Sequence, residues 1–590
     1  MYKITIDAVM YKKTNPQQKL FGVDTQLSPS LRKRLESSWA QLFKIEVLPI
    51  LFRNEDRYAM LYGKTGRPNF SVARLLGLCL LQELNSLSDQ QALDTFSFDV
   101  RWRYALDVSE DEDYLSRRSL VEFRRRLAVK DPEMKLVRNV FDNIRDSAIK
   151  KLGLSANDQR LDSTHIISNI RIRGRLDLFS NTLTLFLRSL SADQLSRVPK
   201  EIQQWHTSES EGWFGLGPAE QKVKVQQLAE YVYDLMDVFG KDDEIKSREP
   251  YQLLKRLFYE QCEFKKDPRS DADSKGHKIQ IKKKTEGVTL QSAYDPDASY
   301  GHKGPGYSLH ITETCNNAAK TEIITDYEVH GAGRSDVGKA LSVIERLDAA
   351  GLKPETLFAD GGYPSVPSAF AISEQDIELM APVNRSRLSD DIMGRDLFQF
   401  DSDGLATKCP MGHSPIDHRI LSGNNTTRRS LFAIFDGDTC RSCKMLEQCP
   451  VRTPNHRNAG CQARDTVGDF RLEITPEIRL RDQMYANQQT TQWKDRYKIR
   501  AGIEATSSEL KRSHGIGKLR VRRAVKVCFA VACKVIACNI KRWAKAHAVL
   551  EGPLQRFLLS VWAHLKMFNA DLVKLSLCVQ NNILAAFLII

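Results

Sequence analysis

The stretch SDVGKALSVIERLDAAGLKPETLFAD (335–360) combines the signals of a helix and of a buried strand. A serine at its start can cap a helix, apolar residues follow at helical spacing, and Gly351 closes the pattern. The residues ETLFAD (355–360) then form a short apolar run that stops at Asp360, before two glycines. The pattern predicts an α-helix followed by a strand that ends on a carboxylate.

Further strand-like runs surround this stretch. A pair of asparagines, Asn316-Asn317, suits a hairpin turn between two of them, and a short helical piece precedes the last one. The resulting order is β, β, β, α, β, α, β, which is the order of a ribonuclease H-like core. We therefore expect an α/β fold with a mixed sheet. The runs are RLDSTHIIS (160–168), YSLHITETC (307–315), KTEIITDYEV (320–329) and DIELMAPV (376–383).

The chain of 590 residues is long enough for several domains. Composition and periodicity predict seven parts. These are a helical N-terminal domain (1–150), the first core strand (151–170), a helical insertion with a basic linker (171–290), the sheet core (291–400), a small cysteine-rich, zinc-ribbon-like insertion (401–465), a core completion carrying the helix of Glu504 (466–550) and a C-terminal helical tail (551–590).

The charge balance favours a polyanionic partner. The 87 Lys and Arg residues exceed the 74 Asp and Glu residues, which leaves a net charge of +13. The longest apolar run, VCFAVACKVIACNI (527–540), contains Lys534 and is shorter than the roughly 20 residues of a membrane span. With no secretory signal in view, the 12 cysteines indicate reduced thiols. We expect a cytoplasmic protein without a membrane partner.

Two aspartates fall at chemically informative places on the predicted strands. Asp162 lies within the first strand, and Asp360 lies at the end of the fourth. Ligands collect at strand ends of α/β sheets, and neighbouring carboxylates there favour bound cations such as Mg²⁺ or Mn²⁺. Taken singly, each aspartate also fits a local role, since Asp before Ser-Thr is a common cap and Asp-Gly-Gly a common turn.

A third carboxylate lies in YKIRAGIEATSSELK (497–511). At about 100° per residue, a helix would place four polar residues on one narrow face, with apolar residues opposite. This face could bind a metal through its glutamate and phosphates through its cations. It could equally be a solvated surface with an Arg-Glu pair. The four residues are Tyr497, Arg500, Glu504 and Lys511.

The spacing Y-x2-R-x3-E-x6-K resembles the signature of bacterial insertion-sequence DDE transposases. LDST at Asp162 and FADGGY at Asp360 resemble the first two acidic motifs of that family, and Glu504 matches its third metal ligand. Residues 66–127 also resemble the helical N-terminal domain of many such transposases, which implies that residues 1–150 form a DNA-binding domain. The likeness covers most of residues 60–170 and 290–540.

The resemblance implies metal-dependent phosphoryl transfer at transposon ends. Two Mg²⁺ or Mn²⁺ ions held by Asp162, Asp360 and Glu504 would support cleavage of the end and attack of its 3′-hydroxyl on target DNA. Tyr497, Arg500 and Lys511 would grip the phosphates of the end. The family further implies a nucleoid-associated homo-oligomer, most simply a dimer in the DNA complex.

The helix RRSLVEFRRRL (117–127) is strongly basic. Its Arg124, Arg125 and Arg126 could contact DNA phosphates, or they could form a charged exposed face without a partner. Both interpretations stay open on the sequence alone.

Four cysteines follow the pattern Cys409-x30-Cys440-x2-Cys443-x5-Cys449, which suits a tetrahedral structural zinc site. The first half of the pattern has a single cysteine, so His413, His456 and Cys461 are possible substitutes for one ligand. The alternative is a set of ordinary reduced cysteines. A four-thiolate site would leave no open position for catalysis.

Two other functions compete with transposition. The first is a ribonuclease H-fold nuclease that cuts nucleic acid without joining it. The second is a non-catalytic DNA-binding protein derived from a transposase. The Tyr-Arg-Glu-Lys face and the N-terminal domain favour transposition over the first, and the presence of all three carboxylates gives no support to the second.

Overall fold

The computed structural model describes residues 11, 13, 22–63, 69–108, 115–170, 174–206, 216–266, 277–285, 288–384, 392–422, 429–451 and 468–550. It contains two compact units. The first comprises Met1–Leu154, Asn317–Ile323 and Cys533–Ile590, and the second comprises Ser155–Asn316 and Ile324–Ala532. The predicted tail (551–590), Gly66-Arg67-Pro68 and the two possible zinc ligands His456 and Cys461 lie outside the described residues.

The first unit is helical, as predicted for the N-terminal part. Residues 72–98 form two helices, because Ser88 and Gln91 form a capping box that starts a new helix. The helices before the sheet are α1 (Pro29–Glu36), α2 (Trp39–Leu42), α3 (Leu48–Arg53), α4 (Glu55–Tyr58), α5 (Val72–Leu84), α6 (Asp89–Phe98), α7 (Val100–Ala105), α8 (Arg117–Lys130) and α9 (Lys135–Leu152).

The apolar run 527–540 forms the middle of α22 (Ala524–Leu550), and its residues 531–540 are buried. Lys534 interrupts this run without leaving the interior, because its ammonium group pairs with Glu83 of α5. No helix within the described ranges is long and apolar enough to cross a membrane.

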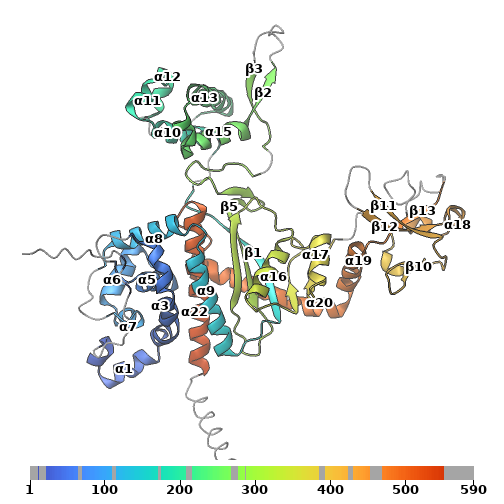
Figure 1. The fold of residues 1–590 in the computed structure, drawn as a ribbon, viewed down its shortest axis with the longest axis horizontal. Coiled ribbons are helices and arrows are strands. Elements are labelled where there is room, and N and C mark those ends of the chain that lie inside the picture. The colour runs from blue at the N-terminus through green and yellow to red at the C-terminus, as the bar shows by residue number, and fades with distance from the viewer. Residues whose placement is uncertain are drawn as a thin grey trace, which may run out of the picture. The chain divides into compact units, whose positions relative to one another are not determined.

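The second unit contains a mixed six-stranded sheet in the order β4-β5-β1-β7-β8, with β6 also paired to β5. Strands β5 and β1 lie side by side in this sheet (Figure 1). Strand β1 is antiparallel to β5 and parallel to β7. Strand β6 is antiparallel to β5, and β8 is parallel to β7. The strands are β1 (Asp158–Ile166), β4 (Ser299–Gly301), β5 (Gly304–Thr314), β6 (Ile324–Gly331), β7 (Thr356–Phe358) and β8 (Glu378–Met380).

The predicted order β, β, β, α, β, α, β is confirmed by β1, β5, β6, α16 (Lys339–Ala349), β7, α17 (Val366–Ser373) and β8. Strands β5 and β6 form the predicted hairpin, and Asn316 adopts a positive φ of 63°, but the connection covers residues 315–323 and is longer than a two-residue turn at Asn316-Asn317. The predicted serine cap at residue 335 is wrong, because α16 begins only after Gly338, whose φ is 81°. The core under the sheet is formed by Leu161, Val343, Ile344, Leu347, Leu357, Ile372 and Leu379.

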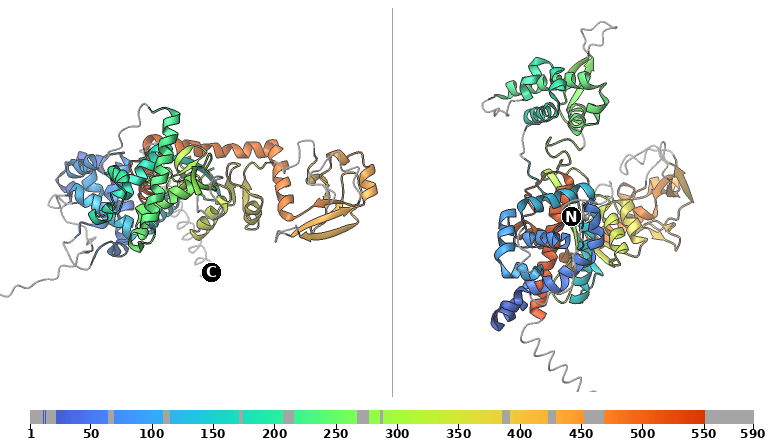
Figure 2. Two further views of the ribbon diagram at one scale, coloured as in Figure 1. Left: turned by 90° about the horizontal axis from the view of Figure 1, so that it is seen from above. Right: turned by 60° about the vertical axis from the view of Figure 1, so that its left-hand side comes forward.

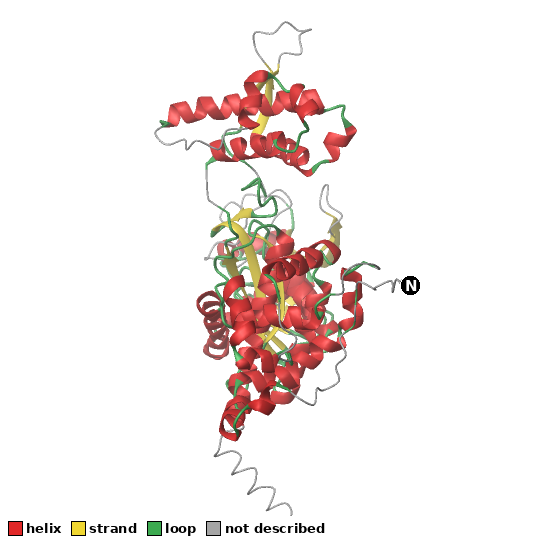
Figure 3. Ribbon diagram, turned by 90° about the vertical axis from the view of Figure 1, so that its left-hand side faces the viewer, coloured by secondary structure: helices red, strands yellow, loops and turns green. Residues whose placement is uncertain are grey.

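The insertion between β1 and β4 is mainly helical (Figure 2), and it has its own apolar core. Its end is not simply a basic linker, because β2 (Cys262–Lys266) and β3 (His277–Ile281) pair as an antiparallel ribbon, drawn in yellow in Figure 3. The helices are α10 (Arg175–Leu187), α11 (Ala192–Ser196), α12 (Lys200–Gln203), α13 (Pro218–Phe239), α14 (Asp243–Ser247) and α15 (Glu249–Gln261).

The cysteine-rich segment is a small β structure around a core that includes Phe398, Phe435, Phe470 and Leu472. It contains a two-stranded and a three-stranded sheet. The elements are β9 (Gln399–Phe400), β10 (Ala406–Lys408), β11 (Asp417–Ser422), β12 (Arg429–Phe435), α18 (Gly437–Ser442) and β13 (Phe470–Glu473).

The predicted uninterrupted helix over 497–511 is broken. After α19 (Pro476–Gln489), α20 (Thr491–Tyr497) ends at Tyr497, a 3₁₀ turn covers Lys498–Ala501, and α21 (Gly502–Ser513) carries Glu504 and Lys511. Ile503, Thr506 and Leu510 are buried, so the predicted apolar face of this segment is confirmed.

Candidate active site

The pairing of β1 with β7 aligns the two aspartates. Arg160 is opposite Phe358 in this parallel pair. Asp162 lies two residues after Arg160, and Asp360 lies two residues after Phe358. Side chains two residues apart in a strand point to the same face, so the sheet brings both carboxylates to one place.

A buried ion pair fastens the segment that carries Arg500 and Glu504 to the sheet. The guanidinium of Arg160 donates from Nε to Glu313 at 2.7 Å and from Nη1 to the carbonyl of Ile499 at 3.0 Å. The other oxygen of Glu313 accepts a hydrogen bond of 2.7 Å from the hydroxyl of Thr506 in α21. These bonds fix the start of α21 over the strand that carries Asp162.

Gly502 allows this close approach. A Cβ at this position would lie only 1.9 Å from Nη1 of Arg160. Any larger residue would push the Arg160 guanidinium away and disturb the start of α21. The motif-based prediction did not identify Gly502, Arg160 or Glu313, because their roles arise from contacts between distant parts of the chain.

Arg500 lies among the three predicted metal ligands. Its Nη2 lies 3.1 Å from Asp162 and 3.9 Å from Asp360, and its Nη1 lies 3.2 Å from Glu504. The 3₁₀ turn and α21 thus place one guanidinium in contact with all three carboxylates. The Arg500-Glu504 pair that the sequence suggested is present, and the two aspartates complete the group.

Burial differs among these side chains. The side chain of Asp162 is 14% exposed, that of Asp360 46% and that of Glu504 67%. Burial raises the pKa of the Asp162 carboxyl, and Asp360 acts in the same direction, whereas Arg500 opposes the shift. Burial lowers the pKa of the Arg500 guanidinium, but the nearby negative groups, Asp162 above all, raise it by more, so the pKa of Arg500 is raised overall. The site therefore opens to solvent on the side of Glu504.

Tyr497 holds the strand end next to Asp360. Its hydroxyl donates a 2.9 Å hydrogen bond to the carbonyl of Ala359. Its ring stacks on Trp493, with the ring centroids 4.6 Å apart. Burial raises the pKa of Tyr497 to about 12, so the phenol stays protonated at neutral pH. This arrangement positions Asp360 and does not require Tyr497 to transfer a proton.

Positive charge lies beside the carboxylates. Lys511 is exposed on α21. Burial, aided by the charges of Lys303 and Lys511, lowers the pKa of His165 on β1. Lys303, in the turn between β4 and β5, also acts on Asp162. No motif pointed to Lys303, and its place in a basic turn, His302-Lys303-Gly304, is the only local signal.

The donor set of this site fits hard divalent cations. It offers carboxylate oxygens from three elements around one guanidinium, and oxygen ligands are those that Mg²⁺ and Mn²⁺ prefer. Asp162 and Asp360 also accept backbone N–H bonds from Ser163 and Gly362, at 2.8 and 2.5 Å. These bonds use Oδ1 of each aspartate, and Oδ2 of each faces Arg500, so a metal ion at Oδ2 would replace the contact with the guanidinium.

The four predicted zinc ligands line one cavity of about 220 Å³ in the cysteine-rich segment. Burial and the neighbouring thiols raise the pKa of Cys440 to about 12, and burial raises that of Cys449 to about 11. Cys409, Cys443 and His413 line the same cavity. The four sulfur atoms do not all lie within 4.8 Å of one another, so they would have to move closer together to form a tetrahedral zinc site.

The three predicted DNA-binding arginines of α8 have different environments. Arg124 lies 2.8 Å from Asp89 of α6 and also bonds Gln82 of α5, so its guanidinium joins three helices. Arg125 and Arg126 both pair with Glu122 on their own helix. The Arg125 side chain is 63% exposed, whereas those of Arg124 and Arg126 are 26% and 23% exposed. The Arg126 guanidinium also lies over the ring of Tyr62.

Comparison with known protein families gives two matches. Residues 408–544 match the family described as transposase DDE domain, and residues 35–126 match the family described as transposase domain (DUF772). These two matches identify a DDE transposase of the insertion-sequence kind. The first match includes Glu504 and the four cysteines, and the second includes α5, α6 and the arginines of α8.

For this transposase, neither the comparison with curated proteins nor that with solved structures gave a match. The family implies DNA as the partner and divalent metal ions as cofactors. Asp162 and Asp360 precede the matched segment 408–544. Their assignment as metal ligands therefore depends on the geometry around Arg500.

Proposed function

We propose that this transposase binds the terminal inverted repeats of its insertion sequence, cuts the DNA at these ends and joins them to target DNA. The observation that carries the proposal is the convergence of Asp162, Asp360 and Glu504 on one guanidinium. Three carboxylates in such contact, partly open to solvent, suit the metal-assisted displacement of phosphodiester oxygens.

The strand order supports a ribonuclease H-like core. Strands β6, β5, β1, β7 and β8 follow one another in the sheet, and only β5 runs against its neighbours. In this core the first aspartate lies on the central strand and the second follows the strand beside it. Asp162 and Asp360 have these positions.

We infer that Asp162, Asp360 and Glu504 hold two Mg²⁺ or Mn²⁺ ions. When bound, these ions lower the pKa of the attacking hydroxyl and stabilise the leaving oxygen. Tyr497 fixes the backbone beside Asp360, and Arg160 with Glu313 fixes the start of α21. The chain thereby supplies a site whose ligands are already close to one another before DNA binds.

Arg500 has two roles in this proposal. Without DNA and metal, its guanidinium limits repulsion among the carboxylates. With both bound, it turns to a phosphate of the transposon end, together with Lys511 and Lys303. A guanidinium suits this exchange because it binds carboxylates and phosphates with the same donor geometry.

The remaining parts have supporting roles in the proposal. The helical N-terminal domain binds DNA, with Arg125 on phosphates and with Arg124 and Arg126 held within the domain. The cysteine-rich segment forms a zinc-ribbon-like module around Cys409, Cys440, Cys443 and Cys449. For the rest of the chain, we propose the domain boundaries that were predicted from the sequence. The transposase acts as a homo-oligomer, most simply a dimer, in a bacterial cytoplasm on nucleoid DNA.

The test uses the purified full-length chain and linear DNA that carries the sequences flanking its gene. We expect Mg²⁺-dependent nicks at the element ends, followed by products in which these ends are joined to a target plasmid. Cleavage without joined products would instead support a nuclease. Specific end binding without any cleavage would support a DNA-binding protein without catalytic activity.

A further inference from the structure

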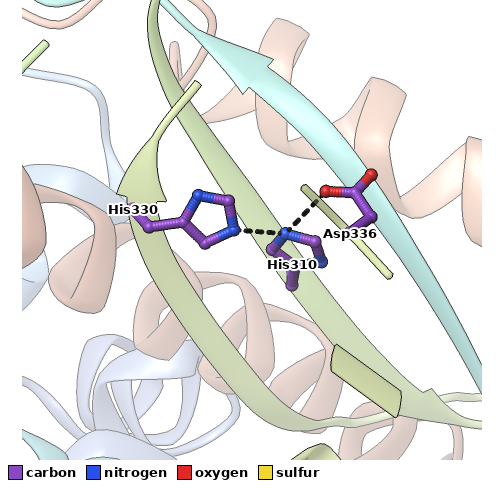
Figure 4. A group of neighbouring side chains, drawn as sticks. All are labelled: His310, His330 and Asp336. Carbon is purple, nitrogen blue, oxygen red and sulfur yellow. Dashed lines mark hydrogen bonds and ion pairs between the residues drawn. The ribbon is translucent and has the colours of Figure 1, made fainter. Parts of the chain in front are cut away.

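A second group of metal-ligating side chains lies beside the carboxylate site. It contains His310 of β5, His330 of β6 and Asp336 of the turn before α16, and their side chains point toward one another (Figure 4). Nε2 of His310 lies 2.7 Å from Nε2 of His330 and 3.3 Å from Oδ1 of Asp336. We propose that these three residues bind a transition-metal ion, with Zn²⁺ as the best fit.

The chemistry of the donors favours zinc over magnesium. Two imidazole nitrogens and one carboxylate oxygen, all within 4.8 Å of one another, can share one ion. Imidazole suits Zn²⁺ and similar metals, whereas Mg²⁺ prefers oxygen ligands alone. The two neighbouring sites therefore select different metals: the carboxylates around Arg500 take Mg²⁺, and the histidine group takes Zn²⁺.

The surrounding hydrogen bonds orient both histidines for this task. Nδ1 of His330 lies 2.9 Å from the carbonyl of Gly331, which only an N–H can donate to, so the lone pair of His330 is on Nε2. Nδ1 of His310 lies 2.7 Å from the hydroxyl of the buried Tyr363. The 2.7 Å contact between the two Nε2 atoms then needs a proton on Nε2 of His310. Metal binding would move this proton to Nδ1, where the hydroxyl oxygen of Tyr363 can accept it, as oxygens beside metal-binding histidines do.

Asp336 is held in the same way. Its Oδ2 accepts a 3.1 Å hydrogen bond from the hydroxyl of Ser163, which leaves Oδ1 for the cluster. The two histidines are only 1% and 6% exposed, whereas the side chain of Asp336 is 33% exposed. Asp336 thus gives an ion a route from solvent, and a water molecule can complete its coordination.

The group of His310, His330 and Asp336 lies next to the segments that carry the two active-site aspartates. Ser163 directly follows Asp162 in β1, and Tyr363 follows the turn of Asp360. An ion bound by His310, His330 and Asp336 would join β5, β6 and the turn before α16 behind the strands that carry both aspartates. This site is separate from the four cysteines and from the carboxylates around Arg500.

The experiment counts zinc in the full-length chain after dialysis against ZnCl₂ with excess MgCl₂, using mass spectrometry of the metal. We expect His330→Gln and Asp336→Asn to lose about one zinc per chain relative to the unmodified protein. His206→Gln, which changes a histidine of the helical insertion, should keep that zinc. Because the thiols form a different site, the double variant His330→Gln/Cys440→Ser should lose one zinc more than either single variant.

A second measurement does not depend on the folding of variants. In the unmodified chain loaded with ¹¹³Cd²⁺, nuclear magnetic resonance separates an ion bound by nitrogen and oxygen from one bound by thiolates. We expect a nitrogen-oxygen resonance that persists with excess Mg²⁺. Its absence, or equal zinc content in His330→Gln and the unmodified chain, would show that the three residues form only a hydrogen-bonded network. Neither readout requires transposition activity.

Discussion

The guanidinium of Arg500 lies 3.1 Å from the carboxylate of Asp162, and it also contacts Asp360 and Glu504. One protein cation thus occupies the electrostatic position that the proposed metal ions need. Guanidinium and metal compete for the same carboxylates, and binding of a DNA phosphate by Arg500 would favour the metal. This coupling links DNA binding to the assembly of the active site.

Removal of the Arg500 guanidinium should strengthen metal binding by the three carboxylates and weaken DNA cleavage. In the DNA-free chain, Arg500→Ala should bind Mn²⁺ about tenfold more tightly, because a nearby charge contributes about 1–4 kcal/mol at this depth. Electron paramagnetic resonance of free Mn²⁺ measures the affinity. End cleavage by the same variant should fall, because a phosphate contact is lost.

Arg496→Ala is the matched control for Arg500→Ala. Arg496 lies on the same segment but pairs with Glu378 at the surface. The Arg496→Ala variant should bind Mn²⁺ with the same affinity as the unmodified chain. Unchanged or weaker Mn²⁺ binding in Arg500→Ala would reject the competition between guanidinium and metal.

Tyr497→Phe should separate positioning from proton transfer. The variant loses the hydrogen bond to Ala359, so we expect a loss of about 1 kcal/mol of stability and a several-fold slower cleavage. Burial raises the pKa of Tyr497 to about 12, so its phenol does not titrate between neutral and mildly alkaline pH. The pH profile of cleavage over that range should therefore match that of the unmodified chain. A profile that flattens in Tyr497→Phe would instead assign the phenol a role in proton transfer.

The arginines of α8 should divide into a structural and a DNA-binding set. Arg124→Ala should lower the free energy of unfolding by about 2 kcal/mol, because Asp89 and Gln82 lose a charged partner. Arg125→Ala should leave the melting temperature unchanged but weaken DNA binding and reduce its salt dependence by about one phosphate contact. Thermal unfolding and binding titrations at several salt concentrations test both. Equal effects of the two substitutions on DNA affinity would contradict this division.

Zinc at the cysteines should stabilise the segment around β12. Cys440→Ser should lose about one zinc per chain and unfold this segment at a lower temperature. Because burial raises the pKa of Cys440 and Cys449, the free thiols are protonated at neutral pH, so zinc uptake must release protons and strengthen as pH rises. Cys528→Ser, which changes a thiol of α22, should keep its zinc. Full zinc content in Cys440→Ser would remove Cys440 from the ligand set.

The sheet was predictable from the sequence because its signals are local. Apolar runs, the Asn316 turn and the glycine after α16 gave the order of strands and helices in the core. The spacing of Tyr497, Arg500, Glu504 and Lys511 then identified a polar face. Each of these signals lies within one segment of the chain and needs no knowledge of its partners.

The remaining features depend on contacts between distant segments. The 3₁₀ turn at Lys498–Ala501 accompanies the bond from Arg160 to the Ile499 carbonyl, and Gly502 leaves room for that arginine. Arg124 looked like a DNA contact because Asp89, its partner, belongs to another helix. The histidine cluster combines two strands and a turn whose spacing matches no familiar metal motif.

The most direct test of the central claim is single-turnover cleavage of a labelled transposon end in Mg²⁺ by Asp162→Asn, Asp360→Asn and Glu504→Gln. Each substitution keeps size and hydrogen bonding but removes a charged metal ligand. We predict that each slows cleavage at least about a hundredfold with DNA binding retained, because metal ions contribute several kcal/mol to this chemistry. Glu345→Gln, on the exposed side of α16, should cleave normally. Near-normal cleavage by any of the three variants would contradict the proposed active site.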